Sequence, residues 1–200
     1  MTQISMTTFI KFISTTGMSK VEIVEKAKEN YNKKYDPKTD FYKRIRDAIK
    51  KYEREQLPKA FLTDFLKDQS TRKQTNYAER LDGYKKWRKK HQITYFSPST
   101  AHWNHGGLSI SVTPELGLNI NGVPHLIRIY FDKPPLAKKR IDVALQLMNL
   151  ACKNKAPSGC AMGILDVRNS RLFTQSGTQN RLQILLRGEA VNFLSMWNDL

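Results

Sequence analysis

The chain has 200 residues, of which 40% are hydrophobic and 10% aromatic, and this content excludes an intrinsically disordered chain. Lys and Arg number 34 against 18 Asp and Glu, which gives a net charge of +16. A charge of that size favours a polyanionic partner, with nucleic acid first and an anionic membrane surface second.

The positive charge is concentrated in the first half of the chain. Residues 1–96 hold 23 Lys and Arg against 12 Asp and Glu, whereas residues 97–200 hold 11 against 6. An acidic protein would bind such a basic surface as well as a nucleic acid would, so an acidic protein partner remains an alternative.

The cysteines and the hydropathy of the chain indicate in which cellular compartment the protein resides. No apolar run approaches the roughly 18 residues of a membrane span, and residues 1–20 lack the order of a signal peptide. Cys152 and Cys160 form no C-x-x-C motif, and no second pair exists to complete a zinc site. We therefore expect a cytoplasmic protein without a membrane partner, whose two thiols are reduced and serve packing.

Apolar residues at helical spacing dominate the first half. Phe41, Ile45, Ile49 and Tyr52, for example, fall on one face of a helix whose remaining surface is basic. The predicted helices are 8–14, 19–30, 40–55, 58–67 and 76–91, with a turn at 35–37.

From residue 93 the pattern changes, because Gly, Pro and β-branched residues become frequent. Residues 108–112 alternate as a strand does, and Asn121-Gly122 is a hairpin signal before the clear strand 125–131. The remaining predicted elements are an irregular strand at 113–120, a helix at 137–153, strands at 160–168 and 171–174, a strand or helix at 182–186 and a helix at 189–200.

These elements predict an α/β fold, with α+β as the alternative. A basic helical region, 1–92, packs on a small mixed sheet flanked by helices, 93–200, and the two regions form one globular unit.

Two of the predicted helices carry clusters of basic residues that would contact a phosphate backbone. Aromatic residues alternate with these basic residues along the two helices. They would either stack on bases or pack in the hydrophobic core, and their helical spacing favours packing in the core. The predicted nucleic-acid-binding residues are Lys43, Arg44, Arg46, Lys50, Lys51, Arg54, Lys85, Lys86, Arg88, Lys89 and Lys90.

Between about 76 and 168 a helix, three strands, a helix and a fourth strand follow one another. Glu115 lies in a P-E-L-G segment on the second strand, and Arg128 lies on the third. This order is similar to the core of PD-(D/E)XK nucleases, and the resemblance implies Mg²⁺ at Glu115 and a water-positioning role for Arg128. Leu126 stands where that family has Glu or Gln, which implies a degraded, non-cleaving member.

The Mg²⁺ site that the resemblance implies at Glu115 lacks a second carboxylate, which another part of the chain would have to supply. Asp166 ends a predicted buried strand and would serve if it converged with Glu115. Three functions therefore remain open: a nucleic-acid-binding protein with a nuclease-like core that grips DNA or RNA, a Mg²⁺-dependent nuclease that uses Glu115, Asp166 and Arg128, and an interaction or inhibitor module for an acidic protein. No cofactor is predicted apart from Mg²⁺ in the nuclease.

Overall fold

The computed structural model describes residues 1–31, 40–134, 136–175, 177 and 179–200, so the turn predicted at 35–37 lies outside the described residues. The helices are α1 (Met6–Ile13), α2 (Met18–Tyr31), α3 (Lys43–Arg54), α4 (Ala60–Lys67), α5 (Thr71–Arg88), α6 (Lys138–Cys152) and α7 (Asn180–Asp199), with a short 3₁₀ helix, η2 (Lys153–Lys155). The strands are β1 (Thr2–Ser5), β2 (Ile93–Phe96), β3 (Ala101–His105), β4 (Leu108–Val112), β5 (Leu116–Ile120), β6 (Val123–Tyr130), β7 (Ala161–Asp166) and β8 (Arg171–Gln175).

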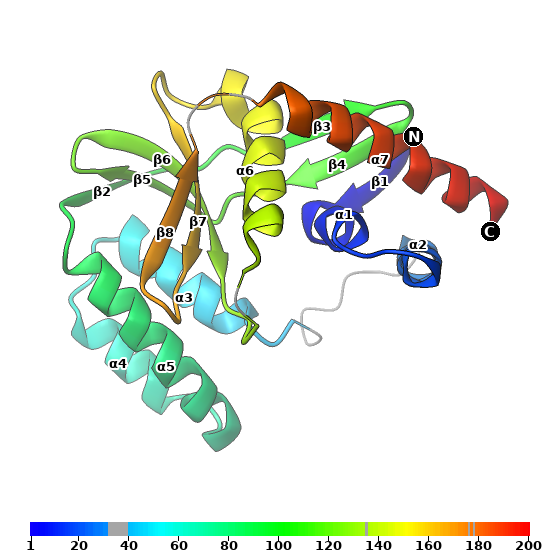
Figure 1. Cartoon of the computed structure of the whole chain (residues 1–200). Helices are drawn as coiled ribbons and strands as arrows, with labels where there is room; N and C mark the ends of the chain where they lie inside the picture. The colour runs from blue at the N-terminus through cyan, green and yellow to red at the C-terminus, as the bar shows by residue number, and fades with distance from the viewer. Residues whose placement is uncertain (32–39, 135, 176, 178) are drawn as a thin grey trace.

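The strands form two sheets between helices, which confirms the predicted α/β fold (Figure 1). The larger sheet has the order β2-β5-β6-β7-β8, and the smaller one has the order β1-β4-β3. In the larger sheet β6 and β7 run parallel, because α6 crosses back between them, while its other neighbouring strands are antiparallel. Within the described residues, no helix is both long and apolar enough to cross a bilayer.

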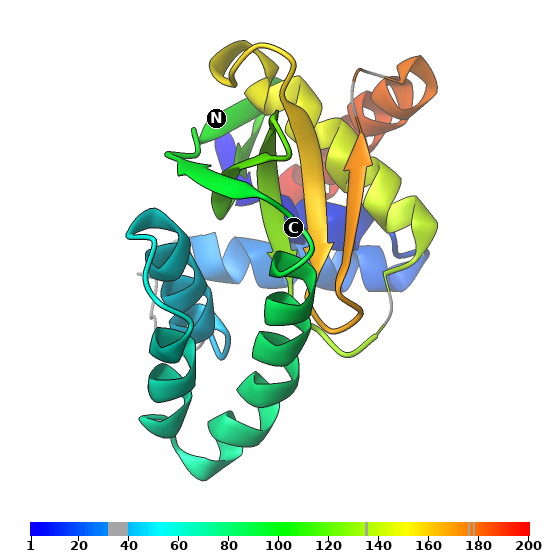
Figure 2. The same cartoon turned by 90° about the vertical axis from the view of Figure 1, so that its left-hand side faces the viewer.

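The larger sheet separates two hydrophobic clusters. Along β6, Ile127 and Ile129 pack with α3, α4 and α5, whereas Leu126 belongs to the cluster around α1, α6 and α7. This alternation follows from the period of two residues in a strand. The α4–α5 pair extends away from the sheets, and the last turn of α5 leads back to β2 (Figure 2).

Several elements differ from the sequence predictions. Strands β1, β2 and β3 were not predicted, residues 108–112 belong to the smaller sheet, and the two segments predicted at 182–186 and 189–200 form the single helix α7. The missed strands have only four or five residues. The partners of β1 and β2 are distant, as in the pairing of Thr2 with Leu108, whereas β3 forms a hairpin with the next strand, β4. The strand predicted at 171–174 is confirmed as β8, which pairs antiparallel with β7.

Gly83 sets the distance between α5 and the β7–β8 turn. A Cβ atom at this position would lie 1.7 Å from the carbonyl oxygen of Val167, and the carbonyl of Gly83 accepts a hydrogen bond from Ser170 at 2.9 Å. Because the obstacle is backbone, no side-chain rotation relieves the clash.

We expect Gly83→Ala to lower the free energy of unfolding by about 1–3 kcal/mol, since α5 must move off the sheet. Gly188→Ala is the matched control: Gly188 lies within α7, and a Cβ atom there would have no neighbour within 4 Å, so alanine gains helix propensity of roughly 0.5–1 kcal/mol. Urea unfolding of both variants checks this, and equal stabilities would contradict the close approach.

Candidate nucleic-acid interface

A hollow of about 370 Å³ lies where the end of α5 meets α3 and the residue before α4. Its lining is aromatic at the base and basic at the rim, and we call it the basic groove. The lining residues are Tyr52, Lys59, Tyr84, Lys85, Arg88, Lys89 and His91.

A buried carboxylate organises this groove from beneath. Glu53 is 3% exposed and accepts hydrogen bonds from the hydroxyl of Tyr84 and, at 2.8 Å, from Nε of Arg88. Arg88 is therefore neutralised by the protein itself, whereas Lys59, Lys85 and Lys89 form no ion pair with any described residue. The lysines are thus the groups left to attract an external anion.

Two pKa shifts follow from this arrangement. Burial raises the pKa of Tyr84 well above its usual value near 10, and the charge and hydrogen bond of Glu53 act in the same direction. Burial, then the charges of Lys90 and Arg88, lower the pKa of His91. His91 is therefore neutral at pH 7 and adds no positive charge to the groove.

The eleven predicted nucleic-acid-binding residues fall into two groups. Lys43, Arg46, Lys51, Arg54 and Arg88 each pair with a carboxylate, namely Asp47, Asp40, Glu55, Glu55 and Glu53. The remaining six form no ion pair in the part of the chain that the structure describes: Arg44, Lys50, Lys85, Lys86, Lys89 and Lys90.

The aromatic residues among these cations pack inward, as the helical spacing predicted. Tyr84 and Trp87 are buried, and Tyr42 and Tyr52 are half-buried. Tyr42 stacks on Phe131 with ring centroids 5.3 Å apart. Base stacking on a wide aromatic platform is therefore not a feature of this surface, and contacts to phosphates are the chemistry that it offers.

Glu115, a predicted metal ligand, takes part in the sheet. Its N–H donates to the carbonyl of Ile127, and its Oε2 accepts from the N–H of Ile129 at 2.9 Å, so the side chain extends the β5–β6 ladder. Its Oε1 lies 3.6 Å from Nε of Arg46. The carboxylate is thus engaged by β6 and α3.

Asp166 and Arg128, the other two predicted catalytic residues, are also held by protein partners. Asp166 is 3% exposed and caps the β7–β8 turn, accepting from the N–H groups of Arg168 and Asn169 and, at 2.7 Å, from the side chain of Asn169. Arg128 donates to Oγ1 of Thr7 in α1 at 2.6 Å. The three residues therefore contact three different parts of the fold.

No cluster of three or more His, Cys, Asp or Glu side chains that could hold a metal ion occurs among the described residues. Glu115 and Asp166 lie on either side of β6, because Asp166 pairs with Tyr130 on the β7 side while Glu115 bonds Ile127 and Ile129 on the β5 side. Their roles as catalytic residues and as Mg²⁺ ligands remain predictions.

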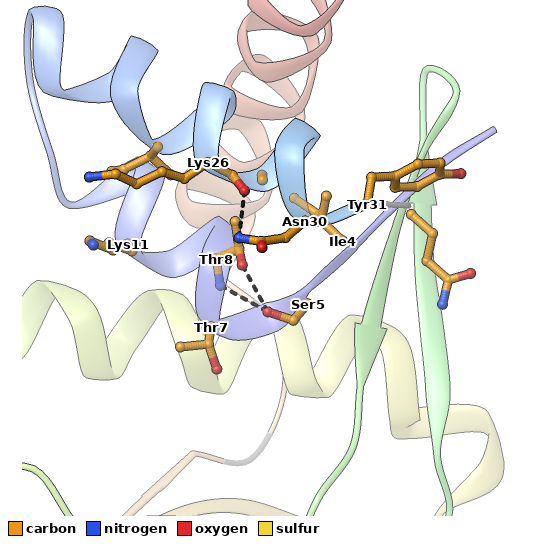
Figure 3. Close-up of a pocket in the computed structure, with 11 residues that line it drawn as sticks. Ile4, Ser5, Thr7, Thr8, Lys11, Lys26, Asn30 and Tyr31 are labelled. Carbon is orange, nitrogen blue, oxygen red and sulfur yellow. Dashed lines mark hydrogen bonds between the residues drawn. The ribbon is translucent and has the colours of Figure 1, made fainter. Parts of the chain in front are cut away.

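Another hollow, of about 560 Å³, lies between β1, α1 and α2 (Figure 3). Ser5 and Thr8 share hydrogen bonds, and Asn30 donates to the carbonyl of Lys26 at 2.7 Å. The side chains of Lys11 and Lys26 also line this hollow, and neither forms an ion pair with a described residue.

Sequence reasoning missed Lys59, which lines the basic groove, and Arg140, which lines a smaller cavity together with Arg128. Lys59 directly precedes α4, outside the two basic clusters, and only tertiary packing brings it to the end of α5. Arg140 had a local signal, because residues 138–140 are three successive cations at the start of a predicted helix, where the helix dipole disfavours them.

No protein-family model matches the chain, and neither curated proteins nor solved structures yield a match. The chain therefore has to be interpreted from its own geometry.

We expect Tyr84→Phe to lower the free energy of unfolding at pH 8 by roughly 1–3 kcal/mol, since Glu53 loses a buried hydrogen-bond donor. The pKa of Tyr84 is raised on folding, so its stabilising contribution is complete below pH 10 and decreases as the pH rises above 10. The deficit of Tyr84→Phe should accordingly shrink by up to about 1.4 kcal/mol per pH unit above pH 10.

Chemical unfolding between pH 8 and 11 measures this change. Tyr31→Phe, at an exposed tyrosine, is the control and should track the wild type at every pH. A deficit for Tyr84→Phe that is constant with pH would contradict the buried pair.

Proposed function

We propose that the chain binds the phosphate backbone of nucleic acid through the basic groove and the adjoining end of α5. The observation that supports this function is a group of cations that form no ion pair within the described residues. Lys59, Lys85 and Lys89 line one hollow, Lys86 lies in the last turn of α5, and Lys90 follows that helix. Lysines that neutralise phosphates release counterions, which gives affinity with little sequence preference.

The distribution of paired and unpaired cations strengthens this proposal. Along α3 many basic residues are bound to carboxylates of the same helix or of the segment before it, such as Arg46 with Asp40 at 2.8 Å. The last turns of α5 contain no acidic residue after Asp82, so no carboxylate of that part of the helix pairs with its lysines. Binding should therefore be centred on the α5 end of the basic surface and not spread along α3.

We expect the double variant Lys59→Glu/Lys89→Glu to bind a labelled oligonucleotide about tenfold or more weakly, with a salt dependence shallower by roughly two phosphate contacts. Fluorescence anisotropy at two or more salt concentrations, with single-stranded and duplex DNA and RNA, measures both quantities.

The matched control is Lys153→Glu/Arg187→Glu, which changes the net charge by the same amount at two exposed cations of η2 and α7. Its affinity should stay within about threefold of the wild type. Equal losses in the two double variants would contradict a localised site, and co-purification of an acidic protein in place of nucleic acid would favour the interaction-module alternative.

A nuclease is the second candidate. The strand predicted at 108–112, the first of the three on which the resemblance rests, is β4 and belongs to the smaller sheet. In the larger sheet β2 pairs with β5 instead, so α5, β2, β5, β6, α6 and the parallel strand β7 still give the order helix, three strands, helix and strand. Glu115 precedes the second of these strands, where the resemblance implies a metal-binding carboxylate.

Plasmid nicking with Mg²⁺ or Mn²⁺ tests the nuclease. If Glu115 binds the metal, Glu115→Gln should reduce nicking by about tenfold or more while it keeps an acceptor for the N–H of Ile129. Glu55→Gln, at an exposed carboxylate, is the control. Equal nicking by wild type and Glu115→Gln would exclude Glu115 as a catalytic residue.

A further inference from the structure

A smaller cavity, of about 120 Å³, lies between α1, the carboxyl-terminal half of β6 and the first turns of α6. It is smaller than the pockets that hold drug-sized ligands, and its size suits a compact group that would replace a few water molecules. It lies where the parallel strands β6 and β7 end, the edge at which open α/β sheets place ligands.

Two arginines from different elements line this cavity, Arg128 of β6 and Arg140 of α6. Arg128 is oriented by its 2.6 Å hydrogen bond to Thr7. Nε of Arg140 is buried and has no hydrogen-bond partner among the described residues. Buried donors without an acceptor are uncommon in folded proteins, so an acceptor supplied from outside the chain would complete the arrangement.

Neither guanidinium is neutralised by a carboxylate of the described residues. Asp132 also lines the cavity, but it is exposed and forms no ion pair within the described chain. The cavity therefore keeps a surplus of positive charge.

The start of α6 reinforces this surplus. Residues 138–140 are all cationic, the first turn contains no acidic residue, and the N-cap residue Ala137 offers no side-chain hydrogen bond. The helix dipole makes cations unfavourable at this end, although Lys138 is compensated by Asp142 at 2.9 Å. An anion bound in the cavity beside Arg140 would offset this unfavourable positive charge.

One wall of the cavity is aromatic. Tyr42 and Phe131 line it and stack with ring centroids 5.3 Å apart, and the hydroxyl oxygen of Tyr42 accepts from Nη2 of Arg80 at 2.9 Å. Arg128 and Arg140 are therefore the cationic groups that the lining offers to an anion.

We propose that this cavity is a binding site for a single phosphate-type oxyanion, held between the guanidinium groups of Arg128 and Arg140. Planar guanidinium groups match the tetrahedral oxygens of phosphate in pairs, and charge-assisted hydrogen bonds of this kind are strong. The anion is a phosphate monoester or inorganic phosphate, and the terminal phosphate of a nucleic acid has the same chemistry. The site is separate from the basic groove and does not depend on the function proposed for that groove.

Isothermal titration calorimetry with inorganic phosphate, at ionic strength held constant with sodium chloride, tests the site in the full chain. We expect saturable binding to the wild type and a loss of affinity of about tenfold or more in Arg140→Gln. Arg140→Gln should fold normally, because Nε of Arg140 bonds no described residue, and thermal melting checks that it does. Arg187→Gln, at an exposed arginine of α7, is the matched control and should bind phosphate like the wild type.

The source of the phosphate is distinguished by two oligonucleotides that differ only in a 5′-phosphate or a 5′-hydroxyl. A preference for the phosphorylated end that disappears in Arg140→Gln assigns the cavity to a nucleic-acid end, while binding of free phosphate without that preference assigns it to a small phosphate ester. The groove variant Lys59→Glu/Lys89→Glu should keep the phosphate affinity of the wild type. The experiments therefore distinguish a failure of the proposed nucleic-acid function of the groove from a failure of the proposed phosphate site in the cavity. Wild-type protein that prefers phosphate no more than chloride, or Arg140→Gln that binds phosphate as tightly as wild type, would overturn the proposal.

Discussion

Arg80 of α5 is fully buried beside the residue that precedes α3 and the residue that follows β6. Its guanidinium therefore needs hydrogen-bond acceptors from the protein. Nε donates to the carbonyl of Phe131 at 2.7 Å, Nη1 to that of Asn76 at 2.6 Å, and Nη2 to the hydroxyl of Tyr42. A buried cation without such partners would be strongly destabilising, so these three segments have to keep their relative positions. The constraint extends to both candidate sites, because Tyr42 and Phe131 line the oxyanion cavity and α5 ends at the basic groove.

A similar buried group fixes the other end of α5. Glu53 of α3 accepts from Tyr84 and Arg88, and this arrangement joins the two helices beneath the lysines of the groove. Glu53 and Arg80 carry charges of opposite sign, but the physical requirement is the same: a charge removed from water needs several hydrogen bonds. Together Arg80 and Glu53 make the surface of α5 a rigid support for the exposed cations.

The net charge of the chain gives an incomplete view of its surface. Glu55 lies near both Lys51 and Arg54, and Glu79 bonds Arg168, so some of the cations are engaged by the protein's own carboxylates. Two groups of the remaining cations lie at the end of α5 and around the start of α6. These are two separate cationic regions. The open groove suits the phosphate backbone of a nucleic acid, and the small cavity suits a single anion.

The amino-acid sequence by itself determined the helical stripes, the central strand at 125–131, the crossover helix that follows it and the inward packing of Tyr84 and Trp87, because these depend on local periodicity. Only the tertiary structure decided the pairing of the short strands, since Thr2 and Leu108 are far apart in the chain. It likewise decided which cations are neutralised and which side chains share a cavity: Glu115 and Asp166 became parts of the sheet and of a turn, while Arg140 joined Arg128. Periodicity specifies which face of an element is buried, whereas contacts between distant residues depend on how the elements pack, and a single sequence carries no local signal for them.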